Sequence, residues 1–320
     1  MINPFEAMQA AINIIHSSQH PTNKIAATIF HEKEGWSYSS TNQWPEEIAI
    51  KIGQNTKIGN SSGTVHAETS CLFTACFQHH HATYESSLCI SDPFCPNCAK
   101  NIAEAGVKTI YIDHKGFTKD FSLRRGDHFE NMSMRIAEKA GINVYEINRK
   151  EERIVPICIA ARDYHPANEM PVSIQPVTET FPLSAHNDHI LEISPKFDDM
   201  KFTCCYAMDT KQAIYFLAAP AHPAIGFQSH QDIYEIAHPQ GKYTFIQEPS
   251  NRLIMTAVKN GFQILNSEIY CSEVPTSREL VNIVGANIKH VIIEEIDAAR
   301  DKFAHIALQV LTEKEILRVS

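Results

Sequence analysis

Two short motifs bring together residue types that bind metal ions. The first is His-Ala-Glu at residues 66–68, and the second is Cys-Pro-Asn-Cys at residues 95–98, which begins 27 residues after the glutamate. An imidazole and two thiolates suit zinc, and three protein ligands leave a fourth position for water, as a catalytic zinc site requires. The sequence therefore predicts a zinc site whose ligands are His66, Cys95 and Cys98.

Glu68 is predicted to transfer protons and not to bind the metal. Two thiolates cancel the charge of Zn²⁺, so the metal acidifies its water less than a site with three histidines would, and a nearby carboxylate is needed. We expect Glu68 to take a proton from that water and to deliver it to the substrate. A C-x-x-C pair at a helix start is also typical of a thioredoxin-like redox site, but the histidine motif at a suitable distance favours zinc.

The elements around the motifs alternate between helical and strand-like patterns. Apolar residues at helical spacing predict helices, and short buried runs predict strands, so that both motifs open helices. The predicted helices are 7–17, 68–77, 98–105 and 128–141, and the predicted strands are 24–30, 87–91, 107–113 and 142–147. Such alternation predicts an α/β domain of three layers, α/β/α, with a central mixed sheet.

The second half of the chain resembles the first. Residues 275–289 align with residues 94–108 at a constant offset of 181, with identities that include Asn282 with Asn101 and Ile283 with Ile102. An internal duplication explains this match, although two generic α/β units would share a helical period as well. We therefore expect two tandem α/β domains.

The predicted domain boundaries follow from this duplication. They are a catalytic domain at 1–150, a proline-containing linker at 151–183 and a degenerate copy at 184–320. At the offset of 181, the three predicted ligands and the glutamate fall on Gln247, Thr276, Glu279 and Pro249, which cannot rebuild the site. We expect a zinc-free, inactive copy that packs beside the catalytic domain and completes its pocket or stabilises its sheet edge.

The two motifs resemble the signature of the zinc-dependent cytidine and deoxycytidylate deaminase superfamily, which is H-x-E followed by P-C-x-x-C. The resemblance covers about residues 1–148 and implies hydrolytic deamination, in which zinc hydroxide attacks the carbon that bears the amine while Glu68 shuttles protons. Residues 124–147 resemble the end of deoxycytidylate deaminases, so the predicted reaction is cytosine to uracil on a dCMP-like substrate. One departure is Phe94, which stands where the family has proline and puts the shape of the pocket wall in doubt.

The resemblance also implies contacts to the substrate. Asn42 matches an asparagine that commonly contacts the sugar, and the backbone amide of Ala67 would bind the base carbonyl. Trp44 is a candidate to stack on the base, with packing at the rim as the alternative, and Asn42 would serve equally well as a turn residue. Arg124 and Arg125 are candidates to hold a substrate phosphate, or else a surface pair that caps the last helix.

Composition limits the class of protein. The chain of 320 residues carries a net charge of -9, with 43% hydrophobic residues, so nucleic acid is disfavoured as a partner and a nucleoside or nucleotide is expected. It has no apolar run long enough to span a membrane and no signal-peptide pattern, so it is expected to be cytoplasmic, where its nine cysteines stay reduced. A homo-oligomer is compatible with the family.

Two alternatives remain open at this point. A tRNA adenosine deaminase is the runner-up, although RNA binding usually requires clustered Lys and Arg. The chain could also be a zinc-bound interaction or regulatory module without turnover, because a fold does not guarantee its usual function. The intact Glu68 argues against such a module.

Overall fold

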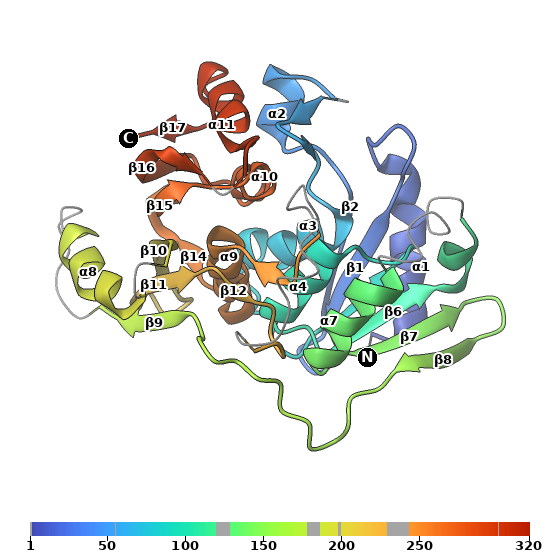
Figure 1. Ribbon diagram of the computed structural model, residues 1–320. Coiled ribbons are helices and arrows are strands. Elements are labelled where there is room, and N and C mark those ends of the chain that lie inside the picture. The colour runs from blue at the N-terminus through green and yellow to red at the C-terminus, as the bar shows by residue number, and fades with distance from the viewer. Residues whose placement is uncertain are drawn as a thin grey trace.

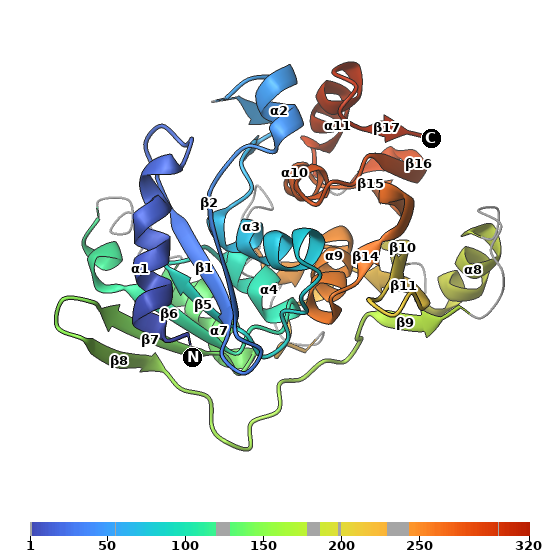
Figure 2. The same ribbon diagram turned by 180° about the vertical axis from the view of Figure 1, so that it is seen from behind.

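The computed structural model describes residues 2–54, 56–119, 129–177, 186–197, 200–228, 243–299 and 301–320. Two mixed β-sheets lie on either side of a shared inner layer of helices (Figures 1 and 2). The first sheet is built from the first half of the chain and the second sheet from the second half. The expected pair of α/β units with mixed sheets is thus confirmed.

The first sheet has the strand order β2-β1-β5-β6-β7-β8. Strand β1 is antiparallel to β2 and β5, strands β5, β6 and β7 run parallel, and β8 returns antiparallel to β7. All six residues of β1 are buried, as expected for a strand covered on both faces. The strands are β1 (Ala26–His31), β2 (Trp36–Thr41), β5 (Ser87–Ile90), β6 (Thr109–Asp113), β7 (Asn143–Asn148) and β8 (Arg153–Cys158).

Five strands of the second sheet repeat the order and directions of β2-β1-β5-β6-β7, whereas β9 lies beside β11, at the edge opposite to the one that β8 occupies in the first sheet. Its order is β9-β11-β10-β15-β16-β17, in which β10 is antiparallel to β11 and β15, and β15, β16 and β17 run parallel. Strand β14 (Gln263–Ile264) also pairs with β10. The strands are β9 (Ser173–Pro176), β10 (Phe202–Met208), β11 (Ile214–Pro220), β15 (Glu268–Val274), β16 (His290–Ala299) and β17 (Arg318–Val319). The shared order and strand directions support the duplication.

Each sheet has an outer helix and a set of inner helices. Successive residues of a strand point to opposite faces. In β1, Phe30 therefore packs with Met8 of the outer helix, whereas Ile29 belongs to the inner core. The outer helices are α1 (Pro4–Ile14), which opens on a capping box of Asn3 and Glu6, and α8 (His186–Ile193). The inner helices are α3 (Ala67–Phe73), α4 (Pro96–Glu104) and α7 (Met134–Lys139) in the first copy, and α9 (Pro249–Asn260), α10 (Ser277–Gly285) and α11 (Ala304–Glu313) in the second.

Shorter elements complete the described chain. They are α2 (Glu46–Lys51), β3 (Lys57–Ile58), β4 (Ser61–Ser62), β12 (His222–Pro223) and β13 (Ile246–Gln247), the 3₁₀ turns Ile15–Ser17, His114–Thr118, Ser194–Phe197 and Leu265–Ser267, and the π-helical segments Thr74–Gln78 and Phe129–Ser133.

The segment expected as a linker, 151–183, contains more structure than its composition indicated. Within its described part, β8 forms an edge of the first sheet and β9 an edge of the second, and the chain between them runs along the outside of the molecule (Figure 1). Pro156 and Pro176 sit in these edge strands, where a residue without an N–H is tolerated. The proline content therefore fits edge strands as well as a linker, and the domain boundaries stay a prediction.

The two copies pack together through buried polar contacts. The side chain of Arg252 in α9 lies 3.6 Å from that of Glu104 in α4, and both residues are buried. Thr256 donates a hydrogen bond of 3.2 Å to the same carboxylate. A single hydrophobic cluster runs through the inner helices of both copies. The copies therefore share one core.

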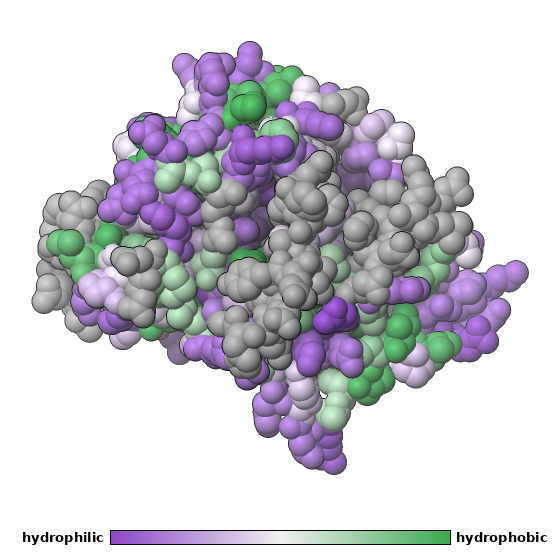
Figure 3. Space-filling model, viewed as in Figure 1, coloured by the Kyte–Doolittle hydropathy of each residue, from purple (hydrophilic) through white to green (hydrophobic). Residues whose placement is uncertain are grey.

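One face of the molecule is shown in Figure 3. In its coloured part hydrophilic residues predominate, and hydrophobic residues form small groups. Among the described helices, none has the length and apolar character that crossing a membrane requires.

Candidate active site

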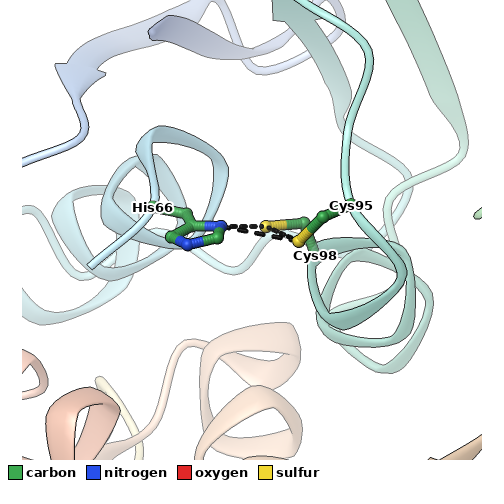
Figure 4. Close-up of side chains that lie close together, drawn as sticks. All are labelled: His66, Cys95 and Cys98. Carbon is green, nitrogen blue, oxygen red and sulfur yellow. Dashed lines mark hydrogen bonds between the residues drawn. The ribbon is translucent and has the colours of Figure 1, made fainter. Parts of the chain in front are cut away.

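The three predicted ligands meet at one point. The Nδ1 atom of His66 lies 3.2 Å from Sγ of Cys98 and 3.5 Å from Sγ of Cys95, and the two sulfur atoms are 3.6 Å apart (Figure 4). Tetrahedral zinc, with its usual bond lengths to nitrogen and sulfur, places such ligands roughly 3.5–3.8 Å from each other. The donor atoms therefore fit a zinc ion, and within the described ranges this is the one group of His, Cys, Asp or Glu residues found suitable for a metal.

Two helix starts position these ligands. His66 is the N-cap of α3, Cys95 is the N-cap of α4, and Cys98 lies in the first turn of α4. Neither N-cap side chain makes the usual capping hydrogen bond to its own helix, since both point to the common centre. The partial positive charge of the two helix starts favours thiolates at this centre.

Burial opposes ionisation of the thiols unless a cation is present. Burial raises the pKa of the Cys98 thiol well above its usual range, and the neighbouring Cys95 raises this pKa further. A bound metal cation would offset this cost and favour both thiolates at the centre.

Glu68 lies next to the ligands in the first turn of α3. Its side chain is buried, with 3% of the residue exposed, and its Oε2 atom has no hydrogen-bond partner among the described residues. Burial raises the pKa of this carboxyl, and the nearby His66 opposes the shift. Buried polar atoms are normally satisfied, so an unpartnered carboxylate oxygen at this place suits a group that exchanges protons with a bound molecule.

A cavity of about 190 Å³ opens onto the ligands. Both copies contribute to its wall. It is lined by His20, Asn23, Ile25, Asn42, Ser62, Thr64, His66, Cys95 and Asn97 of the first copy, and by Tyr243 and Arg278 of the second.

Asn42 lines the cavity, and its side chain organises the loop before β1. Its Oδ1 accepts hydrogen bonds from Ser18 Oγ at 2.7 Å and from the amide of Ile25 at 3.0 Å, and its Nδ2 donates to the carbonyl of Asn23 at 2.8 Å. Asn42 thus holds the neighbouring wall residues in place.

The other predicted positions differ in their surroundings. Ala67 is buried as the first residue of α3, where a helix leaves its N–H groups without partners inside the helix. Trp44 is buried and stacks on His20 at 5.9 Å, and it is not a lining residue of the cavity. Phe94 packs edge-on against Phe129 at 5.4 Å, also away from the cavity wall.

Two further groups complete the comparison with the sequence predictions. Arg124 and Arg125 lie outside the described residues.

Tyr243 and Arg278 line the cavity but were not predicted as site residues, because their position depends on how the two copies pack together. The offset of 181 sets Arg278 over Asn97, a cavity residue within the C-x-x-C motif, and this was the one available signal.

The second copy keeps the two helix starts without the ligands. The N-cap of α9 is Glu248, so the structure places Glu248 on His66 and Ser250 on Glu68, one residue away from the sequence register that gave Gln247 and Pro249. Asn282 bonds to Asn251 as Asn101 does to Thr69, which supports the shifted register in α9. Among the described residues of this copy, no group of three His, Cys, Asp or Glu side chains is close enough together to hold a metal ion, and its zinc-free state stays a prediction.

Glu279 occupies the position of Cys98 at the start of α10. Its carboxylate accepts hydrogen bonds from the amides of Ser250 and Thr276, each at 2.8 Å. The hydroxyl of Thr276 accepts a bond from the Glu279 amide and completes a capping box. One buried carboxylate therefore joins both helix starts of the second copy.

Comparisons with known proteins agree with the geometry. A sequence model of the family described as "Cytidine and deoxycytidylate deaminase zinc-binding region" matches residues 2–114. No curated protein matches the chain.

Several solved structures show partial similarity. A dCMP deaminase from the cyanophage S-TIM5, solved in complex with dCMP and dUMP, is 21% identical, with 44% of this chain and 93% of that chain covered and a TM-score of 0.33. A diaminohydroxyphosphoribosylaminopyrimidine deaminase/5-amino-6-(5-phosphoribosylamino)uracil reductase from Thermotoga maritima is 17% identical over 45% of this chain and 36% of that chain, with a TM-score of 0.28. A tRNA:A34 deaminase is 16% identical over 36% of this chain and 81% of that chain, with a TM-score of 0.23.

The family match covers both motifs and the elements that carry them, from α1 to the end of β6. Residues 2–114, which carry both motifs, are therefore similar to the zinc-binding region of cytidine and deoxycytidylate deaminases, and the cluster of His66, Cys95 and Cys98 agrees with that description.

Proposed function

We propose that the first copy holds zinc through His66, Cys95 and Cys98 and converts cytosine to uracil in a dCMP-like nucleotide. The observation that carries this proposal is the cluster of three donor atoms separated by 3.2–3.6 Å, beside the buried and unpartnered Oε2 of Glu68. A closed structural zinc site would use a fourth protein ligand. The three-residue cluster leaves room for water and opens onto a cavity.

Zinc, when bound, supplies Lewis acidity that makes water nucleophilic near neutral pH. Glu68 accepts a proton at Oε2 as water adds to the ring carbon that bears the amine. It delivers this proton to the ring nitrogen, then takes the proton of the newly added hydroxyl and passes it to the amine. The C–N bond breaks as the C=O bond forms, so that water and substrate yield a carbonyl product and ammonia. The raised pKa that burial gives Glu68 suits a group that must both accept and return a proton.

The rest of the cavity binds and orients the substrate. The amide of Ala67, at the start of α3, would bind the base carbonyl, because the first N–H groups of a helix have no partner inside it. Asn42 holds Asn23 and Ile25 at the cavity wall and so shapes the sugar side of the pocket. A volume of about 190 Å³ favours one small molecule over a polynucleotide segment.

Ammonia release tests the proposal. The full chain, with its zinc content measured, is incubated with dCMP, CMP, deoxycytidine, cytidine, cytosine, guanine, adenosine and a short tRNA stem-loop. We expect release from dCMP and a loss of about 10²–10⁴-fold in rate for Glu68→Gln, because the amide cannot accept the proton.

The Glu68→Gln protein also serves as the blank, since its zinc ligands are intact. Equal rates for wild type and Glu68→Gln would contradict the assigned role of Glu68. Zinc-loaded wild type that is silent on all eight compounds would contradict the proposed reaction and favour a non-catalytic module.

A further inference from the structure

Arg278 is a charged side chain that the degenerate copy places in the catalytic pocket. It lies in the first turn of α10 and lines the same cavity as His66 and Cys95. Its Nη1 donates to the carbonyl of Thr64 at 2.8 Å, and its Nη2 donates to the carbonyl and hydroxyl of Ser62 at 3.2 and 3.3 Å. Three hydrogen bonds across the two copies therefore fix the guanidinium at the wall.

These bonds leave part of the guanidinium available to a ligand. A guanidinium has five N–H donors, and the three bonds to Ser62 and Thr64 leave Nε and one Nη1 hydrogen without a partner among the described residues. Neighbouring donors of this kind match the oxygen atoms of a phosphate or carboxylate, often in pairs.

The charge of the wall points to an anionic ligand. The described lining residues include no carboxylate and no second permanent cation besides Arg278. Two cysteine thiolates would be balanced by the zinc ion that they hold, so they do not compensate the guanidinium. A charge buried without a counter-ion is costly, and a bound anion would offset this cost.

The guanidinium of Arg278 is held in a buried environment. Burial lowers its pKa, and the nearby Cys95 and Cys98 oppose the shift. No carboxylate of the described residues forms an ion pair with Arg278, in contrast to Arg252, which pairs with Glu104 elsewhere between the copies. The guanidinium at the pocket is therefore held by neutral carbonyls and a hydroxyl.

We propose that the second copy supplies the anion-recognition group of the catalytic pocket, and that Arg278 binds the phosphate of a mononucleotide substrate. This rests on the proposed function, because it assigns the phosphate side of the same pocket. Tyr243, also from the second copy, lines the same cavity. The degenerate copy thereby decides between phosphorylated and unphosphorylated substrates.

The test separates binding of phosphate from turnover. Calorimetry on the zinc-loaded full chain compares the product pair dUMP and deoxyuridine, and kinetics compare kcat/KM for dCMP and deoxycytidine. We expect wild type to prefer the phosphorylated compound in both measurements. Arg278→Gln should lower this preference by about 10- to 100-fold, the range for a hydrogen bond to a charged group, and Arg278→Lys should restore part of it.

Arg153→Gln, which removes the same charge from an exposed edge strand, is the matched control and should keep the full preference. If Arg278 only holds the loop at Ser62 and Thr64, both members of each pair weaken together and the preference stays, which overturns the proposal. Failure to bind dUMP more tightly than deoxyuridine in the wild type also overturns it. Phosphate-dependent binding without ammonia release would instead contradict the proposed function and leave the role of Arg278 intact.

Discussion

The two copies begin their inner helices with nearly the same backbone and opposite side-chain chemistry. His66, the N-cap of α3, has φ -70° and ψ 152°, and Glu248, the N-cap of α9, has φ -73° and ψ 151°. In the first copy the N-cap side chains of α3 and α4 leave their own helices uncapped and meet Cys98 at one point. In the second copy Thr276 and Glu279 form a capping box at the start of α10.

The comparison shows two solutions to one physical problem. Two converging helix starts bring unpaired N–H groups and partial positive charge to the same place, and negative charge stabilises them there. In the proposed zinc site the first copy supplies thiolates, which need a metal, and the second copy supplies the Glu279 carboxylate, which does not. The difference also appears in space, since the cavity beside Ser250 and Glu279 holds about 10 Å³, against about 190 Å³ beside His66.

The largest expected effect comes from removing one of the proposed zinc ligands of the first copy. Cys98→Ala removes one of three ligands, so we expect zinc to fall from one ion per chain to nearly none. The rate of ammonia release should fall by about a thousandfold or more, because Lewis acidity contributes several kcal/mol to the reaction. Metal analysis and the dCMP assay measure both quantities.

Cys204→Ala is the control for Cys98→Ala, because Cys204 is a buried cysteine of the second copy without a metal cluster. It should retain one zinc ion per chain. Zinc retained by Cys98→Ala would mean that the cluster at His66 is not the metal site.

Removing the hydrogen bonds of the Glu279 carboxylate in the second copy should lower the free energy of unfolding and leave the zinc in place. In Glu279→Gln, the amide group turns a donor toward one of the amides of Ser250 and Thr276 that the carboxylate now accepts. We expect the free energy of unfolding to fall by about 2–3 kcal/mol, measured by denaturant titration, with zinc unchanged. Glu313→Gln, on the exposed end of α11, should change it by less than about 0.5 kcal/mol. Loss of zinc in Glu279→Gln would show that the metal site of the first copy depends on the hydrogen bonds at the helix starts of the second copy.

Much of the fold could be predicted from the sequence, because apolar periodicity reports the helices and strands directly. The offset of 181 places residues 96–104 on 277–285, and these are the bounds of α4 and α10. For α9, the sequence alignment was one residue away from the structural alignment with α3. The N-cap at Glu248 depends on backbone geometry, which residue identities do not carry. The strands β8 and β9 were missed because proline in an edge strand has the same composition as proline in a linker.

Some residues of the candidate site could be predicted from the sequence, and others depend on how distant segments pack. His66, Cys95 and Cys98 could be predicted because ligand type and spacing are local properties of the chain. Arg278 could not, because its position in the pocket results from the packing of α10 against Ser62 and Thr64, more than two hundred residues away in sequence. The packing there is close at Gly285, where an added Cβ would clash with the side chain of Val65.

The smallest expected effect is the change in the free energy of unfolding when the N-cap of α10 is altered. Thr276→Ala removes the hydroxyl that accepts from the Glu279 amide at 3.2 Å, and should lower the free energy of unfolding by about 1 kcal/mol, with Thr276→Ser restoring most of it. At the matching position in α4, Cys95→Ser introduces a better capping residue, yet it should abolish zinc binding and ammonia release, since a hydroxyl is a poor replacement for a thiolate ligand. Denaturant titration and metal analysis of the three variants compare the two N-caps. Zinc retention in Cys95→Ser, or zinc loss in Thr276→Ala, would contradict the separation of a metal-dependent helix pair from a carboxylate-dependent one.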